Sequence, residues 1–99
     1  MQIEVLTVPG CPHGDAALSR VRQALVIAGR ADAVVAERVI TNPEQATAAG
    51  MIGSPTILID GVDPFATESD RPSFSCRLFQ TDSGLDGAPS IEDLAVSLR

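Results

Sequence analysis

The chain has 99 residues, of which 44% are apolar, and its formal net charge is −6. This length suits one globular domain, and the negative charge argues against nucleic acid or an anionic membrane as the main partner. Aromatic residues make up only 3% of the chain, which predicts an aliphatic core without a stacking platform for bases. No apolar run is long enough to span a membrane and no signal peptide precedes the first expected strand, so we expect a cytoplasmic protein.

The first expected strand covers residues 2–8 and ends at Pro9-Gly10. Cys11-Pro12-His13-Gly14 then opens a helix, and apolar residues at helical spacing continue it over residues 15–29. A thiol at this junction faces unpaired backbone N–H groups and the positive end of the helix dipole, and both favour thiolate over thiol. The pattern predicts a reactive Cys11; the alternative is a small buried residue beside a turn, as many free cysteines are.

The middle of the chain predicts a second strand over residues 33–40 and then a short helix that stops at Gly50. Asn42 is its expected cap, Pro43 its first residue and Gln45 its capping-box partner. The order strand, helix, strand predicts a parallel pair joined by a right-handed crossover.

The last part of the chain predicts two further strands and a helix. A strand at residues 57–59 is followed by a long loop over 62–73, a fourth strand within 75–80 and a loop over 83–88. Ser90 is the expected cap of the last helix, with Asp93 as its partner.

The element order and two motifs resemble the thioredoxin fold over nearly the whole chain. The motifs are Cys11-Pro12-His13-Gly14 at the first helix and Gly53-Ser54-Pro55-Thr56 about forty residues later. The resemblance implies an α/β fold with a small mixed sheet and helices on both faces. It also implies that Pro55 is cis and packs beside Cys11, and that Pro12, Ser54, Pro55 and Thr56 shape a groove for an extended peptide or a thiol. The alternative for Pro55 is an ordinary turn proline before a strand.

Two departures from the thioredoxin pattern change the expected chemistry. Gly14 stands where many relatives have a second cysteine, and Gly10 stands where they have an aromatic residue. A dithiol cycle within the first motif is therefore impossible. Cys11 is predicted either to act as a monothiol that forms mixed disulfides with glutathione or a similar small thiol, or to use Cys76 as a resolving partner. We expect no other cofactor.

The position of Cys76 depends on how the fourth strand pairs. In a simple hairpin its start lies roughly 15 Å from the Pro55 end for five residues of strand, whereas a disulfide needs Cα atoms within about 7 Å. The long loop over residues 62–73 provides another route, because it can carry Cys76 back over the first cysteine. Both arrangements stay open at this stage, and a half-buried strand thiol without chemistry is a third possibility.

A second, shorter resemblance links residues 72–79 and 90–93 to the C-terminal segment of alkylmercury lyases. It implies that Cys11 and Cys76 are mercury thiolates and that Asp15 is the proton donor, although Asp15 comes one position later than the family spacing. Soft thiolates do bind soft metals. Outside this alternative we predict no metal site, and the acids at 60, 63, 68 and 70 are interpreted as a solvated loop.

The predicted function is monothiol exchange through Cys11 with a small-molecule or protein thiol or disulfide. His13 is predicted either to stabilise the Cys11 thiolate or carry its proton, or to be a solvated helix-start residue. Asp15 suits the first helical turn through the dipole alone. The competing hypotheses are the mercury protein and a non-catalytic adaptor that keeps the fold for protein binding. The chain is expected to be a monomer or a homodimer.

Overall fold

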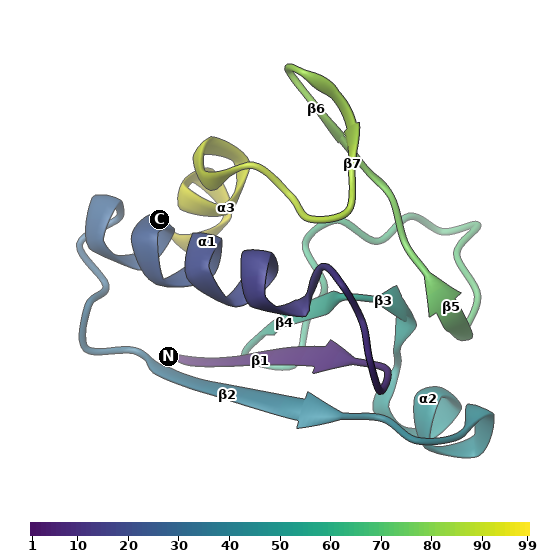
Figure 1. The fold of residues 1–99 in the computed structure, drawn as a ribbon. Helices are drawn as coiled ribbons and strands as arrows, with labels where there is room; N and C mark the ends of the chain where they lie inside the picture. Colours follow the sequence, from purple (N-terminus) through teal and green to yellow (C-terminus); the bar gives the residue numbers. More distant parts are fainter.

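A three-stranded sheet in the order β2-β1-β4 forms the centre of the computed structural model, which describes residues 1–99 (Figure 1). β1 (Gln2–Thr7) pairs in parallel with β2 (Val34–Val39) and antiparallel with β4 (Thr56–Ile59). α1 (Gly14–Ile27) connects the parallel pair. The predicted α/β class, the parallel pair and the mixed sheet are therefore confirmed.

Helices pack against both faces of this sheet, α1 and α3 (Ile91–Leu98) over one face and α2 (Pro43–Ala49) against a small part of the other, because side chains of a strand alternate between its faces. Ile3 and Val5 of β1 lie in the larger core cluster with residues of α1 and of α3. Leu6 points to the other face, where it packs in a smaller cluster with Ala46 of α2. Both clusters are almost entirely aliphatic, as the composition predicted.

The caps of α2 and α3 lie where the sequence placed them. The Asn42 side chain accepts a hydrogen bond from the Gln45 N–H at 2.8 Å, and the Gln45 side chain accepts one from the Thr41 N–H at 3.0 Å. Ser90 accepts from the Asp93 N–H at 3.1 Å. α1 differs from expectation: its first residue is Gly14, so Cys11 and Pro12 lie in a turn before the helix.

The second half of the chain differs most from expectation. β3 (Ile52–Ser54) pairs in parallel with β5 (Ser73–Cys76), so the hairpin between residues 57–59 and the fourth strand is wrong. The expected strand within 75–80 is divided between β5 and β6 (Phe79–Thr81). β6 pairs with β7 (Gly84–Asp86) across a tight turn, where the sequence predicted a loop. The hydroxyl of Thr81 supports that turn by donating to the Gly84 carbonyl at 2.7 Å.

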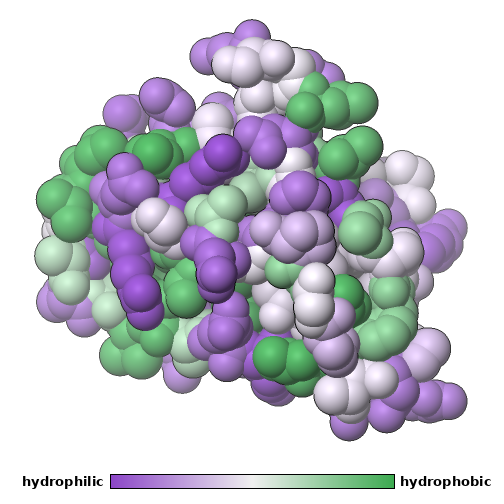
Figure 2. All heavy atoms as spheres, in the orientation of Figure 1, coloured by the Kyte–Doolittle hydropathy of each residue, from purple (hydrophilic) through white to green (hydrophobic).

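The surface mixes polar and apolar residues on the face shown in Figure 2, where hydrophobic residues form several separate groups among hydrophilic ones. α1 is the longest helix with 14 residues. None of the helices combines the length and the apolar character that a membrane span needs.

Candidate functional site

Cys11 lies in a hydrogen-bonded turn between β1 and α1. Its N–H donates to the Val8 carbonyl at 3.1 Å, and its carbonyl accepts from the Gly14 N–H at 3.5 Å. Gly10 precedes it with φ of +73°, a left-handed conformation that glycine adopts without strain. Cys11 is half-buried and Pro12 is exposed, so the thiol is partly open to solvent.

The Ser54-Pro55-Thr56 segment lies next to this turn. The Ser54–Pro55 bond is cis, as the resemblance implied. The Ser54 hydroxyl accepts a hydrogen bond from the Val8 N–H at 3.1 Å, so it fixes the strand end from which the Cys11 turn departs. Thr56 donates to the Gly53 carbonyl at 2.6 Å. All three residues are buried, and both hydroxyls bind the protein's own backbone.

Cys76, the last residue of β5, lies beside the same segment. In the parallel β3–β5 pair it lies opposite Ser54, and the next residue, Arg77, donates its N–H to the Ser54 carbonyl at 3.0 Å. Cys76 itself is exposed. The long loop before β5 therefore carries the second cysteine back to the Pro55 end, which the hairpin geometry had placed far from it. We call Cys11, Ser54, Pro55 and Cys76 the thiol site.

Arg77 fastens β5 in this position. Its guanidinium forms an ion pair with Asp63 at 2.7 Å, with side chains only 10% and 7% exposed, and stacks 4.4 Å above the ring centre of Phe79. On the other side it lies so close to Gly53 that a Cβ there would stand 2.7 Å from the Arg77 Cβ. Asp63 is therefore a structural ion-pair partner and not a solvated loop acid. No local pattern in the sequence indicates this pair, which joins residues across the loop.

His13 packs against the C-terminal segment of the chain. An added Cβ at Gly87 would overlap the imidazole ring of His13, so the ring lies directly against the Gly87 backbone. His13 is half-buried by this contact. His13 is the residue that precedes α1, as the helix-start interpretation expects, but its ring is only partly exposed.

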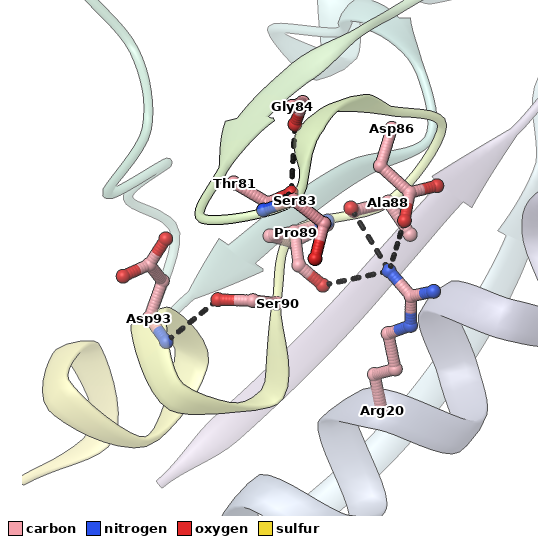
Figure 3. Close-up of polar contacts among 9 residues, drawn as sticks. All are labelled: Arg20, Thr81, Ser83, Gly84, Asp86, Ala88, Pro89, Ser90 and Asp93. Carbon is pink, nitrogen blue, oxygen red and sulfur yellow. Dashed lines mark hydrogen bonds and ion pairs between the residues drawn. The ribbon is translucent and has the colours of Figure 1, made fainter.

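Arg20 of α1 holds the segment that contacts His13 (Figure 3). Its Nη1 donates to a carboxylate oxygen of Asp86 at 3.1 Å, to the Ala88 carbonyl at 3.1 Å and to the Pro89 carbonyl at 3.3 Å. The hydrogen bond from Arg20, with a smaller contribution from the Gly87 N–H, lowers the pKa of Asp86 below its ordinary value. These contacts link α1 to the chain on both sides of Gly87.

The third residue of the mercury hypothesis does not complete a metal cluster. Asp15 is exposed in the first turn of α1. Nowhere in the structure do three or more His, Cys, Asp or Glu side chains gather to hold a metal ion. The hollows on the surface are lined by other residues, and neither cysteine borders one.

Comparisons with known proteins found no counterpart of this chain: no protein-family model, no curated protein and no solved structure matches it.

Proposed function

We propose that the chain is a thioredoxin-like thiol protein in which Cys11 attacks a disulfide and Cys76 is the second thiol. The observation that carries this proposal is the double attachment of Ser54. Its hydroxyl binds the strand end that leads to Cys11, and its carbonyl binds the residue after Cys76. Ser54 thereby connects the two segments that carry the cysteines, which the sequence separates by 65 positions.

The exchange takes place in two balanced steps. The Cys11 thiolate attacks one sulfur of a disulfide RSSR, which forms a mixed disulfide with R and releases RS⁻. The Cys76 thiolate then attacks the Cys11 sulfur, which forms a Cys11–Cys76 disulfide and releases the second RS⁻. The two protons lost by the cysteines end on the released thiols, so RSSR is reduced to two RSH while the protein is oxidised.

Two neighbours suit this role for Cys11. Its backbone is fixed by the turn bond to Val8, so the sulfur is presented at a constant position beside the start of α1. His13 is oriented by its contact with Gly87 and supplies a group that can take or return the thiol proton. Gly14 packs against the Thr7 side chain: a Cβ added at Gly14 would lie 3.2 Å from a Thr7 methyl group. The space for a second cysteine at this position is therefore tight.

Single substitutions separate the roles of the two cysteines. After incubation of the reduced Cys76→Ser variant with glutathione disulfide, we expect one stable glutathione adduct at Cys11, because nothing resolves it. The matched Cys11→Ser variant is expected to gain an adduct at least tenfold more slowly. Intact mass and peptide mapping measure both. Equal rates in the two variants, or no adduct at all on Cys11, contradict the assignment; an unreactive Cys11 favours the adaptor alternative.

A mercury-binding function is the second candidate, because two thiols at one end are a suitable pair of soft ligands. Mercury(II) held by Cys11 and Cys76 needs no third protein ligand, whereas a lyase also needs a proton donor, and Asp15 is exposed in the first turn of α1. This candidate predicts one mercury retained per chain on gel filtration and loss of that metal in either Cys→Ser variant. Retention by both single variants contradicts it.

A further inference from the structure

The edge of β3 beside the thiol site is already occupied by the chain itself. The Ser73 N–H donates to the Met51 carbonyl at 2.9 Å, and the Arg77 N–H donates to the Ser54 carbonyl at 3.0 Å. A strand of the chain itself, β5, therefore pairs with β3 up to Ser54, the residue that precedes Pro55. An extended peptide binds a sheet by adding a strand to an open edge. The edge of β3 that faces β5 is therefore closed to a peptide strand.

β5 is held firmly in this position. Gly53 has φ of +136° and no side chain, which lets Arg77 approach to a distance that any Cβ would obstruct. The Arg77–Asp63 pair is almost fully buried, and Phe79 covers the guanidinium. Displacing β5 would separate the Arg77–Asp63 pair and leave each charge without its partner, which is unfavourable. β5 is thus a fixed part of the site.

We infer that the thiol site takes small disulfides and thiols, of about the size of glutathione disulfide, and rejects extended polypeptides. This inference rests on the proposed exchange function. A small substrate needs only the partly exposed sulfur of Cys11, whereas a polypeptide chain also needs backbone partners near it. The Ser54 carbonyl, next to the cis-proline, is used by Arg77, and Ser54, Pro55 and Thr56 are all buried.

Two probes with one leaving group test this selectivity. The small probe is the mixed disulfide of cysteine with thionitrobenzoate, and the large probe carries the same mixed disulfide at the centre of a nine-residue peptide. Both release the coloured thiolate when Cys11 attacks, so a difference in rate reports access and not leaving-group chemistry. The full chain with Cys76→Ser is used, so that only Cys11 reacts.

We expect the peptide probe to react at least tenfold more slowly than the small probe. Adding Gly53→Ala should narrow this ratio, because the new methyl group pushes Arg77 and β5 away from β3. Equal rates for the two probes overturn the inference while leaving the exchange function intact. If neither probe releases the thiolate, both the size selectivity and the exchange function are contradicted.

Amide hydrogen exchange provides a test that needs no variant. If β5 is a fixed strand, the Ser73 and Arg77 amides of the unmodified protein exchange at least a hundredfold more slowly than the exposed Ser83 amide, which donates a long hydrogen bond of 3.3 Å to the Thr81 hydroxyl. Exchange of the Arg77 amide as fast as that of Ser83 means that β5 detaches readily and contradicts the inference.

Discussion

At the scale of single residues, the contact between His13 and Gly87 gives a glycine a role that its backbone angles do not require. The position has no positive φ, so alanine fits the backbone, but its methyl group would overlap the imidazole. The residue next to Cys11-Pro12 in the sequence is thereby fixed by a segment more than seventy positions away. This fixed ring is the reason to assign His13 a part in proton transfer.

Gly87→Ala is expected to lower the free energy of unfolding by about 2 kcal/mol, because overpacking forces the His13 ring out of its place. The double variant with His13→Ala removes the ring and should regain most of that loss. Urea unfolding of the two single variants and the double variant measures the coupling between the sites. Strict additivity of the two single effects would show that ring and glycine do not meet.

The Arg20–Asp86 ion pair is expected to make the free energy of unfolding depend on pH in the acidic range. The pKa of Asp86 is lowered in the folded state, so its charged form contributes stability above the unfolded-state pKa, near 3.9 for an aspartate. That contribution is lost as the pH falls through the folded-state pKa. The free energy of unfolding should therefore fall less steeply with acidification below about pH 4 in Asp86→Asn than in the unmodified chain. Asp82→Asn, an exposed neighbour without an ion pair, is the control and should follow the unmodified chain.

At the scale of elements, β5 depends on contacts from outside its own strand. It has four residues and pairs only with β3, across an irregular register between Ile52 and Ser54. Such a short pair has little stability of its own. The buried Arg77–Asp63 ion pair compensates by connecting the end of β5 to the loop before it.

Asp63→Ala should therefore destabilise the protein by about 3 kcal/mol, because it leaves the Arg77 guanidinium buried without its partner. Asp82→Ala removes the same charge from an exposed position and should change the free energy of unfolding by less than about 0.5 kcal/mol. Thermal and urea unfolding of both variants measure the difference. A loss for Asp63→Ala no larger than that for the control would mean that the pair does not hold β5.

Elements whose signals are local were predictable. The caps at Asn42 and Ser90 and the apolar stripe of α1 lie within single helices, and they matched the structure. The β3–β5 pairing was not predictable, because it depends on the approach of Gly53 to Arg77 across twenty-four positions of chain. The Asp63–Arg77 ion pair and the contact between His13 and Gly87 were not predictable either, because both join residues far apart in the sequence.

At the scale of the whole molecule, one end of the central sheet gathers the groups that carry chemistry. The sequence predicted Cys11, His13 and Pro55 there from two motifs, and left two arrangements open for Cys76. The structure excludes the hairpin arrangement, because β5 lies opposite Ser54 instead of extending β4.

The most direct test of the account is the intact mass of the unmodified reduced chain after mild oxidation with glutathione disulfide. If Cys11 and Cys76 form one site, the product is a monomer that has lost two hydrogens, and peptide mapping finds the Cys11–Cys76 disulfide. A glutathione adduct that persists on Cys11, with Cys76 still reduced, would contradict the two-cysteine site and leave Cys11 to act alone.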